Sequence, residues 1–154
     1  MSAEGPLRDG NAAGLELIET MHWQPGSGFA RIARHMARLR GSAAELGFAC
    51  DIQKTTDALA DAVEEASDAM RVRLALARDG SATITIQPFV PLAADKTWTL
   101  RLALTELDSG DTLLRHKTSR RERYVQARAE YPAGEADELI LANERGELCE
   151  GTIT

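Results

Sequence analysis

Hydrophobic and polar positions change their spacing several times along the chain, and each change predicts a new element. Residues 15–23, LELIETMHW, carry apolar side chains that predict a strand entering the core. From Phe29 onward, apolar side chains recur every three or four residues, which is the spacing of one buried helix face. Gly47 is expected to end this helix. A similar stripe predicts a second helix over residues 55–70.

The next part of the chain predicts strands. Apolar side chains alternate with other residues over 72–76 and again over 82–86, and the Asp-Gly pair at residues 79–80 is a turn sequence. These two segments are therefore expected to form a hairpin. Residues 97–104, TWTLRLAL, place Trp98 and three leucines on one side, which predicts another half-buried strand.

The last third of the chain is expected to open a second domain. Residues 105–111, TELDSGD, are polar and contain a glycine, so they are interpreted as a connection. Residues 138–142, ELILA, and a strand that begins at Glu147 predict a short hairpin. The pattern predicts a mixed α/β (α+β) fold, with a small N-terminal domain over residues 1–105 and the opening segment of a larger domain over residues 106–154.

Composition and charge narrow the classes of function. The chain has 154 residues, of which 44% are hydrophobic, and this suits a globular α/β protein. No apolar run reaches the length of a membrane span and the polar start does not resemble a signal peptide, so a cytoplasmic protein without a membrane partner is expected. The formal charge of −6 argues against a nucleic-acid partner. Cys50 and Cys149 lack the spacing of a metal site, so no metal is expected.

Residues 112–124, TLLRHKTSRRERY, reverse the sign of the charge locally. Lys117 has five basic neighbours in this segment: Arg115, His116, Arg120, Arg121 and Arg123. Because nearby cations favour the neutral form of a lysine, which is the form that attacks a carbonyl, Lys117 is a candidate nucleophile. The alternatives are a seat for an anion and a solvated basic face of a helix.

The second half of this basic segment predicts the start of a helix. Ser119 followed by Glu122 matches a capping box, so a helix is expected from just after Lys117 to about Glu130. Lys117 would then lie between a strand and a helix, where the positive end of the helix also favours the neutral amine.

Arginines also share one face of the first predicted helix. Arg31, Arg34 and Arg38 fall opposite its apolar stripe. A solvated charged face is the ordinary meaning of such a pattern, and a site for a phosphate group is the alternative.

Three strings, HMARLRGSAAELGF, LLRHKTSRRERY and ANERGELCEGTIT, follow one another in the order and spacing of a known family. They resemble the three N-terminal signature regions of the class IV aminotransferases, which are fold type IV enzymes that depend on pyridoxal 5'-phosphate. The family includes branched-chain and D-amino-acid aminotransferases and aminodeoxychorismate lyase. The resemblance covers residues 14–154, and LELIETMHWQPGSGFARIARHMARL together with RHKTSRR is most similar to the lyase-like members.

The resemblance implies a role for three residues. Lys117 matches the family lysine that is covalently attached to pyridoxal 5'-phosphate and later moves the proton. Glu150 matches the carboxylate that faces the pyridine nitrogen, and its separation from Lys117, 150 − 117 = 33 residues, is similar to that in the family. Arg38 matches the arginine that holds the cofactor phosphate. Each role suits its side chain, because a protonated ring nitrogen needs a carboxylate and a phosphate needs a guanidinium.

The resemblance also implies a reaction. The leading expectation is a lyase of the folate pathway that forms 4-aminobenzoate and pyruvate from a small amino substrate, with Lys117 removing the proton alpha to the nitrogen. The runner-up is an amino-acid aminotransferase of the branched-chain or D-amino-acid type, in which Lys117 moves that proton to the cofactor carbon. A third hypothesis is a non-catalytic remnant or an anion-binding protein that uses the arginines of the basic segment. Family members are commonly homodimers, so self-association is expected.

Two features depart from the family pattern. The residues before LELIET, NAAGL, are few and lack the aromatic that helps to shape the substrate side in the family. Similar proteins also continue well past EGTIT, so the chain is interpreted as a fragment or truncated version. An unfinished second domain with an exposed apolar edge is therefore expected. A second chain that supplies the rest, or an inactive remnant, are the alternatives.

Overall fold

The computed structural model describes residues 14–153, which form two compact units with mixed α/β structure. The first unit contains residues 14–91 together with residues 116–120, and the second contains residues 92–115 and 121–153. The expected α/β class is therefore confirmed. The expected domain boundary after residue 105 stays a prediction.

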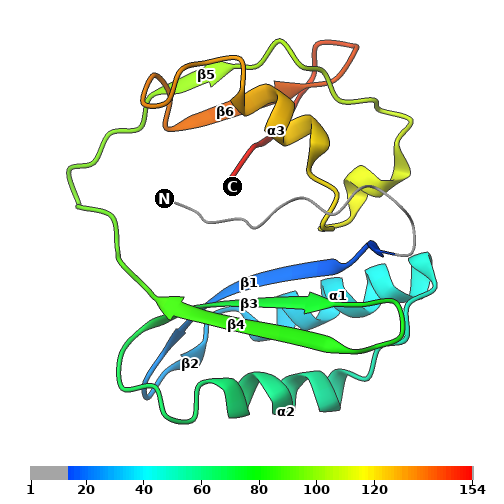
Figure 1. Ribbon diagram of the computed structural model, residues 1–154, viewed down its shortest axis with the longest axis vertical. Helices are drawn as coiled ribbons and strands as arrows, with labels where there is room; N and C mark the ends of the chain where they lie inside the picture. The colour runs from blue at the N-terminus through cyan, green and yellow to red at the C-terminus, as the bar shows by residue number, and fades with distance from the viewer. Residues whose placement is uncertain (1–13, 154) are drawn as a thin grey trace. The chain divides into compact units, whose positions relative to one another are not determined.

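The first unit is built on an antiparallel sheet with the strand order β2-β1-β3-β4 (Figure 1). Its strands are β1 (Leu17–Gln24), β2 (Gly28–Phe29), β3 (Met70–Leu76) and β4 (Ala82–Pro88). The expected hairpin is confirmed, with Leu76 paired to Ala82 and a turn in which Gly80 has φ 87°.

Two helices cover one face of this sheet. Helix α1 (Ile32–Leu46) ends at Gly47 as expected, and helix α2 (Ile52–Ala62) begins at Asp51, whose carboxylate accepts a hydrogen bond from the backbone of Lys54. The two helices and the strands bury a common apolar core that includes Leu17, Met21, Met36, Leu39, Leu59, Val72, Leu74 and Leu76.

The ends of both helices differ from expectation. Phe29 belongs to β2, and α1 begins only after Arg31, which has φ 56°. Helix α2 was expected to reach Met70 but ends at Ala62, and Met70 is the first residue of β3. Acidic residues follow the end of α2, and negative charge is unfavourable at a helix C-terminus, so the apolar stripe alone overestimated its length.

The second unit has a three-stranded sheet with the order β5-β6-β7, and the short helix α3 packs on it (Figure 1). Strand β5 (Leu100–Leu102) is parallel to β6 (Glu138–Ala142), and β6 is antiparallel to β7 (Leu148–Gly151). Helix α3 (Glu122–Arg128) follows the 3-10 turn η2 (Thr112–Arg115). The core of this unit consists of Leu107, Ala127, Leu139 and Leu141.

Two expectations about the second unit are corrected and one is confirmed. The hairpin predicted from residues 138–142 and a strand beginning at Glu147 is present, and its second strand begins one residue later, at Leu148. The strand predicted over residues 97–104 contains only three residues, and its leucines are not half-buried, since Leu100 is 55% exposed, Leu102 60% and Leu104 84%. Helix α3 begins at Glu122 and ends at Arg128, so it is shorter than predicted. No helix in the described residues 14–153 has the length and apolar character needed to cross a membrane.

Candidate active site

Lys117 lies in a short extended segment that runs antiparallel to the start of β1. Its carbonyl oxygen accepts the backbone N–H of Ile18 at 2.8 Å, and the N–H of Ser119 donates to the carbonyl of Glu16 at 2.9 Å. Between these two bonds Leu17 and Thr118 form a bridge. The backbone of the candidate lysine is therefore fixed at the edge of the first unit's sheet.

The same contacts explain why the capping-box prediction is wrong. The hydroxyl of Ser119 accepts the N–H of Glu16 at 3.0 Å and does not cap a helix. Helix α3 has Arg121 at its N-cap, with no side-chain hydrogen bond to the helix end. Lys117 is consequently in an extended segment, five residues before the helix.

The pairing also shows on which face of the sheet Lys117 lies. Paired residues in an antiparallel sheet point to the same face, and neighbours in one strand point to opposite faces. Thr118 therefore shares the helix-covered face with Leu17, and Lys117 shares the other face with Ile18. Thr20, which is two residues after Ile18 in β1, lies on that same face and pairs with Arg73.

Arg73 is a cation that the sequence analysis did not single out. It is partly buried on β3, and it makes no side-chain hydrogen bond or ion pair with any residue in the described range. An arginine without a carboxylate partner, on the face that also carries Lys117, is suited to bind an anionic group of a ligand. The alternating pattern of MRVRLAL was the available signal, because it places Arg71 and Arg73 opposite the apolar residues.

His116 attaches the Lys117 segment to helix α1. Its Nδ1 is 2.9 Å from the hydroxyl of Ser42, its Nε2 is 3.6 Å from a carboxylate oxygen of Glu45, and its side chain is only 5% exposed. Lys117 thus follows a residue that is anchored within the same unit, and its backbone has little freedom.

Arg38 also lies in the first unit, on α1, where it forms a two-pronged ion pair with Glu19 of β1. Its Nε donates to Oε1 at 2.7 Å and its Nη2 donates to Oε2 at 2.5 Å. The hydrogen bond with Glu19 raises the pKa of Arg38 above its usual value, so the guanidinium stays charged. The Arg38 side chain is 47% exposed. Its Nη1 has no acceptor among residues 14–153 and can bind a ligand.

Glu150 lies in the second unit, on β7. The hydroxyl of Tyr124 donates to its Oε1 at 2.7 Å. Arg121 stacks on the Tyr124 ring, with 4.5 Å from its Cζ to the ring centroid, and donates through Nη2 to the carbonyl of Thr152. Helix α3 and the end of β7 are therefore linked around the candidate carboxylate.

A second carboxylate fixes the residues that follow Glu150. Glu138 is 2% exposed and accepts the backbone N–H groups of Thr152 at 2.8 Å and of Ile153 at 3.0 Å, together with the Thr152 hydroxyl at 2.6 Å. Because this carboxylate begins β6, it ties the start of one strand to the end of the next. In the sequence, ELILA predicts only a strand, and its pattern gives no sign of this role.

The arginines of the basic segment do not form one patch within a unit. Arg120 belongs to the first unit, whereas Arg115, Arg121 and Arg123 belong to the second. The guanidinium of Arg121 already contacts Tyr124 and Thr152. An anion-binding role that uses all four arginines together stays a prediction.

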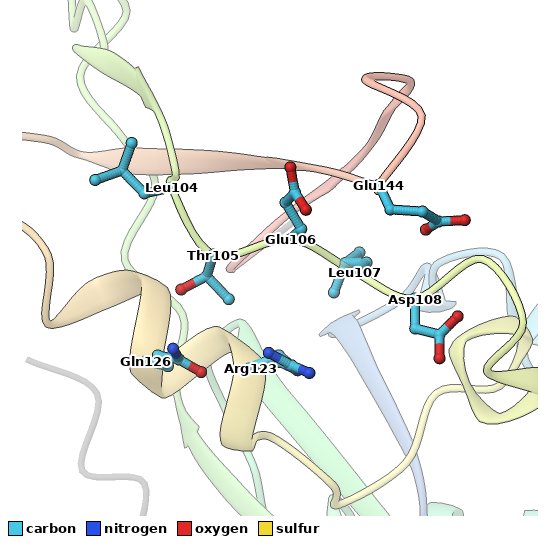
Figure 2. Close-up of a pocket in the computed structure, with 8 residues that line it drawn as sticks. All are labelled: Leu104, Thr105, Glu106, Leu107, Asp108, Arg123, Gln126 and Glu144. Atoms are coloured by element: carbon cyan, nitrogen blue, oxygen red, sulfur yellow. The ribbon is translucent and has the colours of Figure 1, made fainter.

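The second unit contains a shallow cavity of about 380 Å³ that none of the three predicted site residues lines (Figure 2). Residues 104–108 form one wall, Arg123 and Gln126 of α3 form another, and Glu144 completes it. Hydrogen bonds from Ser109 lower the pKa of Glu144 to about 2, so this carboxylate is charged at neutral pH. With three carboxylates and one arginine in its lining, the cavity does not favour a phosphate.

Comparison with known proteins assigns the chain to a family. The sequence profile of amino-transferase class IV matches residues 16–154. A search of curated proteins returned no significant match.

A solved structure of similar sequence gives the same result, and two others share the fold. A candidate amino-acid aminotransferase from Mesorhizobium loti is 66% identical, with a TM-score of 0.86 over 90% of this chain and 67% of that one. The 4-amino-4-deoxychorismate lyase from Pseudomonas aeruginosa is 22% identical, with a TM-score of 0.74 over 99% of this chain and 62% of that one.

A candidate branched-chain amino acid aminotransferase from Thermotoga maritima has the same fold, with 20% identity and a TM-score of 0.77 over 90% of this chain and 50% of that one. The chain thus spans between one half and about two thirds of these structures. Members of the matching family are enzymes that use pyridoxal phosphate. The chain belongs to the class IV aminotransferases, a family of pyridoxal-phosphate enzymes.

Proposed function

We propose that the protein is a pyridoxal-phosphate-dependent enzyme that removes the proton next to the amino group of a small amino substrate. The observation that carries the proposal is the placement of Lys117. Its segment is held at the sheet edge by two backbone hydrogen bonds, one to Lys117 and one from Ser119, in the unit that also presents the ion-paired Arg38, and the family match covers Lys117 and Arg38. Bound cofactor would supply an electron sink for the charge that develops on the substrate carbon.

The described residues fit this cofactor chemically. Arg38 keeps donors for a phosphate group, Glu150 offers a carboxylate to a protonated ring nitrogen, and Lys117 offers the amine. Lys117 is the residue that takes the substrate proton and returns it. Its fixed backbone favours this role, because a general base must reach the same atom in every turnover.

We also assign Arg73 to the substrate. It shares a sheet face with Lys117 and has no carboxylate partner in the described range, so it can pair with a substrate carboxylate through two parallel hydrogen bonds. Amino-acid and aminodeoxychorismate substrates both carry carboxylates, and this assignment therefore suits either reaction.

Two reactions compete within this chemistry. The strings that resemble lyase-like members favour formation of 4-aminobenzoate and pyruvate, as in folate biosynthesis. The 66% identity with a candidate amino-acid aminotransferase favours amino-group transfer instead. The two are separated by supplying an amino acid without a keto-acid acceptor. Accumulation of pyridoxamine phosphate identifies the aminotransferase, and catalytic release of pyruvate from aminodeoxychorismate identifies the lyase.

The shared function is tested by adding pyridoxal phosphate, reducing with borohydride and mapping the labelled peptide. The label is expected on Lys117 and is expected to disappear in Lys117→Ala. The matched control is Lys54→Ala, because Lys54 is exposed on α2 and makes no side-chain ion pair in the described range. Label distributed over Lys54 and Lys96 would contradict the proposal.

Self-association as a homodimer is part of the proposal and rests on the family resemblance. Light scattering of the purified protein is expected to give twice the chain mass. A monomer that nevertheless carries the reduced label on Lys117 would separate the dimer proposal from the catalytic one.

A further inference from the structure

Glu19 is a buried carboxylate to which the proposed chemistry gives no task. It lies in the middle of β1, on the face that also carries Leu17 and Met21, and its side chain is 1% exposed. A charged group in an apolar core is strongly unfavourable unless it is paired and hydrogen-bonded. A carboxylate at this position therefore needs hydrogen-bonding and charged partners, and side chains of helix α1 provide them.

Both oxygens of Glu19 are occupied by side chains of α1. Oε1 accepts Nε of Arg38, and Oε2 accepts Nη2 of Arg38 at 2.5 Å and Nδ1 of His35 at 2.6 Å. Two parallel bonds between planar groups fix the plane of the guanidinium as well as its position. His35 lies one helical turn before Arg38 and restrains the same carboxylate oxygen from the side.

This arrangement uses only one edge of the guanidinium. The Nε–Nη2 edge of Arg38 faces Glu19, while Nη1 points elsewhere and lacks an acceptor in residues 14–153. The pair as a whole is formally neutral. Any attraction of Arg38 for an anion therefore depends on the direction of its remaining N–H groups more than on net charge, and direction is what Glu19 controls.

We infer that Glu19 is a positioning residue that holds Arg38 ready to bind the phosphate of a monophosphate ester before the ligand arrives. The inference rests on the proposed function and adds that the phosphate contact is assembled within the first unit alone. The competing view is that Glu19 and Arg38 form an ion pair that only joins β1 to α1. That view predicts no particular effect on phosphate recognition.

The two views are separated by comparing pyridoxal phosphate with pyridoxal, which has the same aldehyde and ring but no phosphate. Dissociation constants of both are measured for the full protein by visible absorption. The dissociation constant of pyridoxal divided by that of pyridoxal phosphate reports phosphate recognition. In Glu19→Gln and in Glu19→Asp this ratio is expected to fall about tenfold or more, because a directed charge-assisted contact is lost. The affinity for pyridoxal is expected to change less than about twofold.

Three further variants serve as controls. Glu65→Gln, which removes an exposed carboxylate just after α2, is expected to leave the ratio unchanged. Arg38→Lys keeps the charge but loses the planar fork, so it is expected to lower the ratio as well. Adding Glu19→Asp to Arg38→Lys is then expected to cost little more, since both changes act on one contact.

Folding is controlled by the choice of substitution. Glu19→Gln leaves Arg38 without a counter-ion, whereas Glu19→Asp keeps the buried charge. If the glutamine variant does not fold, the result for Glu19→Asp decides between the two views. A folded Glu19→Asp protein with an unchanged ratio, or with equal losses for both aldehydes, overturns the inference. If the wild-type protein forms no reducible adduct on Lys117 with either aldehyde, the proposed function itself fails, and that result is distinct.

Discussion

Tyr124 donates its phenolic hydrogen to Oε1 of Glu150 across 2.7 Å, so a residue of α3 sets the orientation of a carboxylate on β7. Arg121 covers the Tyr124 ring and binds the carbonyl of Thr152, two residues beyond the carboxylate. If Glu150 faces the pyridine nitrogen as proposed, this network determines the direction from which it does so.

Replacing Tyr124 with phenylalanine is therefore expected to lower turnover of the cofactor-loaded enzyme about tenfold, because the freed carboxylate loses its fixed position. The free energy of unfolding is expected to fall by only about 1 kcal/mol, the usual cost of one lost hydrogen bond. Turnover and urea unfolding are measured on the same preparation. The matched control is Tyr131→Phe, which removes a hydroxyl that donates to the carbonyl of Leu102 at 2.9 Å. Equal turnover of the two variants would show that Tyr124 does not act through Glu150.

Local pattern predicted the elements of this fold well where neighbouring residues decide the structure. The hairpin around residues 79–80 and the end of α1 at Gly47 depend on turn and cap residues that the sequence displays directly. The expected capping box at Ser119 failed for the opposite reason, because the hydroxyl of Ser119 is used by Glu16, which is 103 residues away in the chain. Such a long-range contact leaves no mark on the spacing of residues near Ser119.

The same distinction applies to the site. Lys117, Arg38 and Glu150 were identified by resemblance to a family, whereas the groups that hold them were not. Glu19 was visible in principle, since the order Leu17-Glu19-Met21 places a carboxylate on the apolar face of a strand. Its partner could not be read from the sequence, because the fold alone brings α1 against β1. Glu138 was missed in the same way, since its partners lie across a hairpin.

Glu138→Gln is expected to lower the free energy of unfolding by about 2 kcal/mol, because an amide donor would replace the oxygen that accepts the N–H of Ile153 or of Thr152. Chemical unfolding at neutral pH measures the change. Glu135→Gln, at an exposed position a few residues earlier, is the control and is expected to be nearly neutral. A loss in Glu138→Gln no larger than in the control would mean that the buried carboxylate does not secure the end of β7.

Gly41 inside α1 and Gly47 at its C-cap are expected to respond in opposite directions to the same substitution. Gly47 has φ 73°, so Gly47→Ala is expected to destabilise the protein by about 1 kcal/mol. Gly41 lies inside the helix, and an added methyl group there would meet no atom within 4 Å. Gly41→Ala is therefore expected to stabilise by about 0.5–1 kcal/mol through higher helix propensity. Thermal unfolding of both variants is the measurement, and a shift in the same direction for both would contradict the assigned end of α1.

The exposed contact between Ser109 and Glu144 is expected to make the free energy of unfolding depend on pH in the acid range. Ser109 donates its N–H to Oε2 of Glu144 at 2.9 Å and its hydroxyl to Oε1, which lowers the pKa of Glu144 from 4.5 to about 2. A carboxyl whose pKa is lowered by folding stabilises the folded state above its unfolded pKa, and this contribution is lost as pH falls from about 4.5 toward 2.

In Ser109→Ala the hydroxyl contribution is absent at every pH. The difference in unfolding free energy between wild type and Ser109→Ala is therefore expected to be largest at neutral pH and to shrink between pH 4.5 and pH 3, as urea unfolding across that range would measure. The matched control is Ser67→Ala, which removes an exposed serine hydroxyl that donates to Asp68 at 3.0 Å and does not contact Glu144. A difference that stays constant from pH 6 to pH 3 would rule out Ser109 as the cause.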